Sequence, residues 1–331
     1  MSVGLFCFAH EVGLREHGPV SFRQTARHQM GLGYLTMALA IGLFSTIEVF
    51  IKLIGPEIPP LRLAFLRFEL TGLILLIPSI QKLRMREKLF TSRDAGTLLV
   101  MSLIGVTLAI GLYHLSLRYL PANIGAIVFS ANPVFIALFA PWILKERVTF
   151  WRKAALAIGV VGVGVMAFRD GHVPFALGWG ILLMLASEVF FALYSVLSKK
   201  YLSRYGARVI TCCAGIVGGA ALLPFSWALE GAPFAPISGM AWIKLAYLVV
   251  GATALAYILY FHGMARLGAA RGAMFFFMKP VLASVFAWLI LGEQVTAPIL
   301  AGGALIVAAL AASSAEGFAH RHDQGRATPM R

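Results

Sequence analysis

Long apolar runs alternate with short polar connections along most of the chain, from residue 32 to residue 314. Each run holds about 20 residues with few charges, which is the length that an α-helix needs to cross the hydrocarbon core of a bilayer. The pattern therefore predicts an all-α integral membrane protein with ten transmembrane helices. The predicted spans are 32–54, 61–80, 95–117, 122–144, 150–168, 177–199, 207–229, 241–264, 270–291 and 296–314.

The two ends of the chain are polar. Residues 1–31 lack the basic and apolar regions of a signal peptide, so they predict a cytoplasmic N-terminal tail, and residues 315–331 predict a cytoplasmic C-terminal tail. Because the first apolar run begins directly after Met30, a translation start at Met30 is an alternative to a start at Met1.

The composition is typical of a membrane protein. Hydrophobic residues make up 60% of the chain and charged residues 13%, with a mean hydropathy of +0.84, whereas a soluble domain carries about 25% charged residues. The net charge of +14 would suit a nucleic acid, but the basic residues lie in short loops between apolar runs. The lipid bilayer is therefore the expected partner, and nucleic acid is not. Cys7, Cys212 and Cys213 lack metal-ligand spacing, so neither a metal nor a cofactor is expected.

The lysines and arginines predict the orientation. Segments on the N-terminal side of the membrane hold 21 of them, while the loops on the other side clearly show only Arg118 and Arg169. Since basic residues concentrate in cytoplasmic loops, both termini should be cytoplasmic. The expected location is the plasma (inner) membrane of a bacterium, in a multi-pass arrangement.

One stretch of the chain occurs twice. Shifted by 147 residues, 120–149 lies over 267–296 without a gap, and 14 of the 30 positions are identical. Shared apolar composition does not align a proline, a glutamate and a threonine in one frame, so two homologous halves follow, 32–168 and 177–314. The matched residues are Gly125/Gly272, Phe129/Phe276, Pro133/Pro280, Glu146/Glu293 and Thr149/Thr296, with Tyr113/Tyr260, Phe44/Phe191 and Lys52/Lys199 outside the stretch.

The two halves are predicted to be inverted. Five spans per half is an odd number, so the second half must cross the membrane in the opposite direction. The repeat agrees, because the predicted inner turn 145–147 (Lys-Glu-Arg) aligns with the predicted outer turn 292–294 (Gly-Glu-Gln), which has lost both basic residues. Inverted repeats are the architecture of alternating-access transporters.

The doubled motif resembles a known family. Leu-x-Ala-x-x-Gly-Ala, the mid-span proline and Leu-x-Glu-x-Val-Thr look like the EamA domain of the ten-helix branch of the drug/metabolite transporter superfamily. Leu66-Arg67-Phe68 in span two also resembles the segment with that domain's usual arginine. The resemblance covers 32–314. It implies two EamA repeats around a central cavity and transport of a small metabolite, which it does not name.

The sequence thus predicts a secondary active transporter, an exporter of a small metabolite such as an amino acid or related compound, and not an enzyme. Two alternatives stay open. A non-transporting receptor or scaffold explains the spans but not their inversion, and an intramembrane enzyme would need a nucleophile and base that are not visible. Proton coupling is a further expectation. A homodimer is another, because small-residue pairs such as Gly215/Gly219 form either scaffold or dimer faces.

The middles of the spans carry the candidate substrate residues. Pro133 and Pro280 interrupt the hydrogen bonding of spans four and nine, and such breaks are tolerated in lipid only against protein or water. Both are therefore expected to be hinges or to border the cavity, and kinks that only pack against neighbouring helices are the alternative. Asn132 and Lys279 precede these prolines at equivalent positions. Since a cation at mid-depth is costly, Lys279 should face the cavity or a carboxylate.

Two glutamates are candidate partners and candidate coupling residues. Glu188 has no cation within one turn of its helix, so Lys279 is its expected partner, and proton binding is the alternative role. Glu48 lies four residues before Lys52, on the same helical face. These two are expected to neutralise each other near the outer boundary.

The remaining candidates have alternative roles. Arg67 should close an ion pair within its own half. Tyr113, His114 and Tyr260 are cavity candidates, although an interfacial aromatic belt explains tyrosines near span ends well. Phe276 either lines the cavity or packs.

The turns after spans four and nine hold repeated polar residues. Glu146 and Glu293 lie in these turns and are expected to be structural. Thr149 and Thr296 follow them and are the expected N-caps of spans five and ten.

Overall fold

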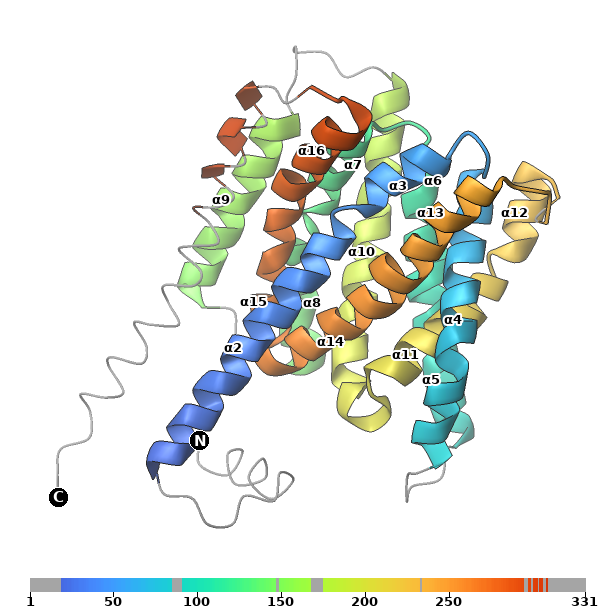
Figure 1. The fold of residues 1–331 in the computed structure, drawn as a ribbon. Helices are drawn as coiled ribbons and strands as arrows, with labels where there is room; N and C mark the ends of the chain where they lie inside the picture. Colours follow the sequence, from blue (N-terminus) through green and yellow to red (C-terminus); the bar gives the residue numbers. More distant parts are fainter. Residues whose placement is uncertain are drawn as a thin grey trace, which may run out of the picture.

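The computed structural model describes residues 19–84, 91–146, 149–167, 175–232, 234–294 and part of 297–308, and the regular elements in these ranges are all helical. Figure 1 shows long helices that cross one another in one bundle, with α9 at one edge and α4, α5 and α12 at the other. Eight helical spans within the described residues are long and apolar enough to cross a membrane. The all-α membrane fold predicted from the sequence is confirmed.

The first half provides the first five predicted spans. Its elements are α2 (Pro19–Phe44) and α3 (Ile47–Ile54) in span one, α4 (Pro60–Arg84) in span two, α5 (Ser92–Ser102), η1 (Leu103–Ile110) and α6 (Gly111–Ser116) in span three, α7 (Ala122–Phe129) and α8 (Asn132–Leu144) in span four, and α9 (Phe150–Ala167) in span five.

The second half provides spans six to nine, and of span ten the structure describes only part of 297–308, which is helical. Its elements are α10 (Phe175–Tyr205) in span six, α11 (Ala207–Cys213), η2 (Ala214–Gly218) and α12 (Leu223–Glu230) in span seven, α13 (Gly239–Val249), η3 (Val250–Leu255) and α14 (Ala256–Leu267) in span eight, and α15 (Ala269–Ala273), η4 (Met274–Phe277) and α16 (Met278–Leu291) in span nine.

Irregular turns recur at the repeat distance. The π-helices η1 and η3 begin at Leu103 and Val250, which are 147 residues apart. Spans four and nine are both interrupted just before their prolines, the first by the gap between α7 and α8 and the second by the 3₁₀ turn η4. Wide and tight turns inside helices often occur at functional sites, and these four lie at mid-span.

Spans four and nine lie side by side and run in opposite directions. α7 packs against α16, and α15 packs against α8. The start of each span therefore lies beside the end of its repeat counterpart. Figure 1 shows the consequence, with α15 and the end of α8 at the end of the bundle where α2 begins, and α7 and the end of α16 at the opposite end.

Small residues let two helices approach closely within the bundle. A Cβ atom added at Gly215 would lie 2.6 Å from the Phe68 carbonyl oxygen and 2.7 Å from the Gly72 nitrogen, so only glycine fits against α4. One turn later, a Cβ at Gly219 would lie 3.0 Å from the Glu69 nitrogen. The pair Gly215/Gly219 is thus a scaffold contact inside the chain and not a dimer face.

Candidate functional site

Aromatic rings from both halves meet at the centre of the bundle. They form three repeat-related pairs, and all six side chains are at most 5% exposed. Ring centroids lie 5.8 Å apart between Phe129 and Phe276, 5.1 Å apart between Tyr113 and Phe129, and 5.6 Å apart between Tyr260 and Phe276. We call this set the aromatic cage, and its members are Phe44, Phe129, Phe191, Phe276, Tyr113 and Tyr260.

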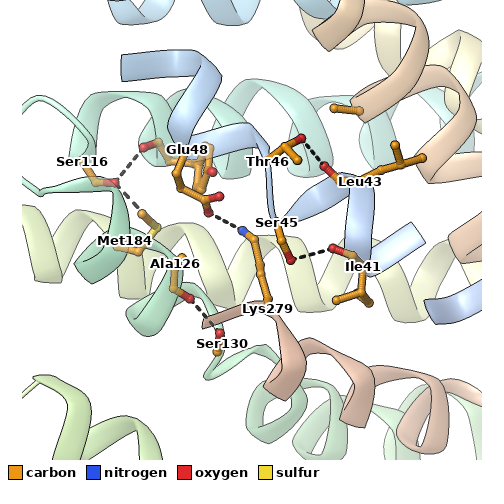
Figure 2. A network of polar contacts seen from close by, with 12 residues as sticks. Ile41, Leu43, Ser45, Thr46, Glu48, Ser116, Ala126, Ser130, Met184 and Lys279 are labelled. Atoms are coloured by element: carbon orange, nitrogen blue, oxygen red, sulfur yellow. Dashed lines mark hydrogen bonds and ion pairs between the residues drawn. The ribbon is translucent and has the colours of Figure 1, made fainter. Parts of the chain in front are cut away.

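Lys279 lies against this cage and pairs with Glu48. Its Nζ is 4.0 Å from the centroid of the Phe129 ring and 5.5 Å from that of Tyr113, both within cation–π range. Nζ also donates a hydrogen bond to Glu48 Oε1, and both side chains are at most 1% exposed (Figure 2). This is the ion pair at the centre of the protein.

Local chemistry in span one places Glu48 there. The Ser45 hydroxyl donates to the Ile41 carbonyl at 2.7 Å and the Thr46 hydroxyl to the Leu43 carbonyl at 2.8 Å (Figure 2). Such bonds back to the preceding turn favour a bend or break in a helix, and α2 ends at Phe44. The helix restarts as α3, whose first turn carries Glu48.

Two predicted pairs are therefore wrong. Glu48 does not pair with Lys52, which instead donates to the Leu117 carbonyl at 2.8 Å. Glu188 is not the contact partner of Lys279 but interacts with it at longer range. The break in span one turns Glu48 toward span nine, a change that the spacing within a straight helix could not show.

Glu188 is buried without a close cation. It is fully buried in α10 and its side chain interacts with that of Asn132, but neither side chain completes a well-formed hydrogen bond with any residue that the structure describes. Glu188, Asn132 and the Glu48–Lys279 pair still form one polar cluster, since Lys279 interacts electrostatically with both carboxyls. We refer to these four residues as the central cluster.

Arg67 reaches the same region from α4. Its Nε donates to Thr253 Oγ1 at 2.6 Å and its Nη2 to the Ala252 carbonyl at 3.4 Å, both in the second half. The predicted ion pair within the first half is therefore wrong. Both acceptors belong to the π-helix η3, whose backbone departs from regular α-helical hydrogen bonding.

A small cavity lies between these groups. It has a volume of about 20 Å³, room for one water molecule, so the centre is closed in this conformation. Its lining combines the aromatic rings with two cations. The lining residues are Phe44, Ile47, Arg67, Ile110, Tyr113, Phe129, Phe191, Tyr257, Phe276 and Lys279.

The tyrosine and histidine candidates occupy different places. Tyr113 and Tyr260 are at most 2% exposed and belong to the cage, so the interfacial-belt explanation is wrong for both. His114 is buried and borders a second, larger cavity of about 500 Å³ at the end opposite the start of α2, together with Lys52 and Arg118. Tyr257 and Thr253 are part of the centre and were not predicted, because no sequence repeat marks them.

Each of the two repeated glutamates holds the start of the other half's helix. Glu146 accepts hydrogen bonds from the Ala269 and Ala270 nitrogens at 3.2 and 3.4 Å. Glu293 accepts from the Ala122 and Asn123 nitrogens, both at 3.3 Å. Every one of these positions is related to its counterpart by the same shift of 147 residues. We call these contacts the glutamate clamps.

A residue with left-handed backbone conformation precedes each clamp glutamate. Lys145 and Gly292 end α8 and α16 with φ of +57° and +69°, a conformation that commonly terminates helices. The next residue is the clamp glutamate, and the antiparallel packing puts a helix start within its reach. Its carboxylate satisfies backbone N–H groups that have no partner within their own helix and lies at the positive end of the helix dipole. The structural role predicted from the sequence is thus a contact between the halves.

The two clamps differ in their lysines. Lys199 contacts Glu146 at 2.5 Å, whereas the equivalent Lys52 interacts with Glu293 only electrostatically. Burial raises the pKa of the Glu146 carboxyl, but Lys199 and the two backbone N–H groups outweigh burial and hold this pKa below its usual range. The Glu146 carboxylate is therefore charged at neutral pH.

The N-cap role predicted for Thr149 and Thr296 finds little support. Thr149 directly precedes α9 as predicted, but its buried hydroxyl has no hydrogen-bond partner among the described residues, so no side-chain cap forms. Thr296 lies outside the described residues.

The prolines adjoin the centre. Pro133 and Pro280 are buried beside Asn132 and Lys279, one turn after the cage residues Phe129 and Phe276. The helix interruption predicted for span four and span nine is present in both.

Replacing either proline by alanine should lower transport several-fold while folded protein stays in the membrane. Alanine restores a backbone donor and allows a straighter helix. The cage residue that lies one turn before the proline, Phe129 or Phe276, would then change its position. The measurement is solute flux per folded protein. Pro141→Ala is the matched control, because Pro141 also lies inside α8 but has Trp288 at its repeat equivalent. Normal flux in both variants would make the interruptions packing features only.

These features define a multi-pass helical membrane protein whose two inverted halves enclose a buried polar centre. The EamA-like transporter family matches residues 31–168 and 178–315. The chain belongs to the EamA-like transporter family and contains two EamA domains. It is therefore a transporter, and the intramembrane-enzyme alternative is wrong.

Similar proteins include transporters of bacteria and archaea. An uncharacterized transporter of Clostridium kluyveri is 28% identical over 286 residues, which is 84% of this chain and 91% of that protein. A probable terminal-alkyne amino-acid exporter of Streptantibioticus cattleyicolor is 30% identical over 191 residues, 57% of this chain and 63% of that protein. One crystal structure superimposes with a TM-score of 0.69 at 20% identity, covering 86% of this chain and 95% of that one, so the fold is shared.

Proposed function

We propose that this chain is a secondary active exporter of a small metabolite, an amino acid or related compound, and that it works by alternating access. The observation that carries the proposal is the pair of reciprocal glutamate clamps at opposite ends of a closed, polar centre. A protein that exposes one central site to each side in turn needs a closure at each end, and inverted repeats provide two equivalent ones.

The Glu146 clamp closes the cytoplasmic side in this proposal. It joins the turn after α8 to the start of α15, and α15 lies at the end of the bundle where α2 begins (Figure 1). The segments rich in basic residues are predicted to lie on that side of the membrane. Since cytoplasmic loops are enriched in lysine and arginine, both termini would be cytoplasmic, in the inner membrane of a bacterium. The Glu293 clamp then closes the outer side, where Lys52, which interacts electrostatically with Glu293, lines the 500 Å³ cavity.

Transport would break one clamp at a time. Opening the cytoplasmic side separates Glu146 from the start of α15 and admits solute to the centre, while the Glu293 clamp holds the outer side closed. Opening the outer side reverses these states. Each opening exposes its carboxylate and backbone N–H groups to water, which replaces the lost hydrogen bonds, so the two states can differ by little in free energy.

Glu188 is the group that we assign to proton coupling. No cation among the described residues contacts it, and its oxygens make no well-formed hydrogen bond, so it can take up a proton without losing an existing contact. Glu48, the other candidate, is already engaged by Lys279. The amino-acid assignment is supported by the similarity to the probable amino-acid exporter of Streptantibioticus cattleyicolor.

The test is flux through the purified protein in proteoliposomes. We expect saturable movement of an amino acid or related compound that an imposed proton gradient drives uphill and that Glu188→Gln uncouples, leaving downhill flux. Glu69→Gln is a control, since Glu69 is also a glutamate within a span but is only partly buried and lies outside the central cluster. An absence of flux for all such compounds would refute the proposal, and unchanged uphill flux in Glu188→Gln would refute the coupling assignment.

A further inference from the structure

One nitrogen of the Arg67 guanidinium has no acceptor. Nε and Nη2 are fixed by Thr253 and the Ala252 carbonyl, but Nη1 has no hydrogen-bond partner among the residues that the structure describes. The side chain is only 1% exposed and borders the central cavity. A buried charged donor without an acceptor is strongly unfavourable, so this nitrogen points to a group that is absent from the chain itself.

The neighbouring carboxyls do not fill this role. Glu48 is bound to Lys279, and no carboxylate within the described ranges lies at ion-pair distance from Arg67. Glu48 acts on Arg67 only electrostatically at longer range. Because Glu48 and Lys279 neutralise each other, the charge of Arg67 is left without an anionic partner at contact distance in the part of the bundle that is described, although the centroid of the Phe68 ring lies 5.2 Å from its Cζ.

The second half has no arginine at the equivalent position. The repeat equivalent of Arg67 is Ala214, which is buried to 2% exposure in η2. The second half therefore packs with a methyl group where the first half has a guanidinium. A costly buried cation that one repeat has and the other lacks is best explained by a ligand.

We propose that Arg67 binds the carboxylate of the transported molecule, and that the aromatic cage surrounds its apolar body. This inference rests on the proposed transport function and specifies its substrate class as small organic carboxylates with an apolar body, including apolar amino acids. Nη1 and the second N–H of Nη2 form the planar fork that fits a carboxylate in a bidentate manner. Thr253 and Ala252 hold the guanidinium plane in place for this contact.

Charge and volume agree with this assignment. A bound carboxylate would neutralise the charge of Arg67. The substrate-bound centre would then carry no uncompensated cation during the change from one side of the membrane to the other. The cavity holds about one water molecule in the closed conformation, and opening of a clamp must widen it before a ligand can bind. The cage supplies ring faces and edges for an apolar group of several carbon atoms.

The first experiment varies the ligand and leaves the protein unchanged. The thermal stability of the purified full chain is measured with L-phenylalanine, 3-phenylpropionate, phenylalaninamide and phenethylamine, and with the corresponding four compounds of the leucine series. The carboxylates should bind about 10- to 100-fold more tightly than the amides and amines, as expected for charge-assisted hydrogen bonds. Equal binding of the amides, or no binding by any carboxylate, overturns the inference. Chloride or phosphate binding equally well would show a general anion site and would also overturn it.

The second experiment varies the protein. Arg67→Gln should abolish the preference for the carboxylate, and Arg67→Lys should retain only part of it because an ammonium group lacks the planar fork. Arg93→Gln is the control, since Arg93 is exposed at the start of α5. An unchanged preference in Arg67→Gln overturns the inference, and the ligand series decides alone if that variant does not fold. Flux of amines without flux of carboxylates would refute the role of Arg67 but leave the transport function standing.

Discussion

Glu48→Gln is expected to destabilise the protein by about 3–5 kcal/mol, the usual cost of removing one partner of a buried ion pair. The variant leaves the Lys279 ammonium in a site that is 1% exposed. The Phe129 and Tyr113 rings can offset only part of this cost. The measurements are the yield of folded protein from membranes and its thermal stability in detergent.

The double variant Glu48→Gln with Lys279→Met should recover most of the loss, because it removes both charges together. Glu188→Gln is the matched control. It removes a carboxyl that is equally buried but does not contact Lys279, so its effect on stability should be smaller and should depend less on Lys279→Met than the effect of Glu48→Gln does. If the losses of Glu48→Gln and Lys279→Met simply add, the two residues are not energetic partners.

Breaking one glutamate clamp should open only its own end of the protein. Glu146→Ala leaves two backbone N–H groups and Lys199 without their acceptor, at a cost of about 1–3 kcal/mol for a buried group. The population should then move toward the form that is open at the Glu146 end. Glu293→Ala should move it toward the form that is open at the other end. Both variants should slow transport, because each disturbs the balance between the two states.

The change in population between the two open forms can be measured by cysteine labelling at two positions that the repeat relates. In a background in which Cys7, Cys212 and Cys213 are replaced, cysteine is introduced at Ala269 or at its repeat equivalent Ala122, both at most 1% exposed. Glu146→Ala should speed labelling at position 269 but not at 122, and Glu293→Ala should do the reverse. Equal acceleration at both positions would indicate general unfolding rather than the opening of one end.

Acid should mimic the loss of the Glu146 clamp. Because its folded-state pKa is held below the usual glutamate range, the clamp contributes stability above that range and loses it as pH falls through the folded-state pKa. Because acid also lowers the thiolate fraction of every cysteine, the labelling rate at position 269 is divided by the rate at an exposed cysteine at the same pH. This ratio should rise in acid in the wild-type chain. In Glu146→Gln the ratio should be high at every pH, whereas a pH response of the ratio that survives this substitution would assign the effect to another group.

Hydropathy and self-similarity were enough to predict the architecture. A transmembrane span depends on a continuous apolar run, and a repeat depends on identities in one frame, so both are properties of the linear chain. The breaks before Pro133 and Pro280 were predictable for the same reason, since proline acts on its own helix. The repeat also marked Glu146 and Glu293 as special, although it did not show what they contact.

Contacts between the spans were decided by the tertiary structure. Glu48 was assigned to Lys52 because a straight helix brings residues four apart together, but a break after Phe44 turns it toward Lys279, 231 residues away. For Tyr113 and Tyr260 the sequence leaves both a cavity role and an interfacial role open, because hydropathy estimates depth along one span and not position within the bundle.

The repeat shift links Glu146 to Glu293, but only antiparallel packing of spans four and nine brings each glutamate to the helix start of the other half. Sequence alone determined which segments are equivalent, because equivalence is encoded in residue identities. The folded bundle decided which charges meet, because the distance between two side chains depends on how the helices pack and where they break.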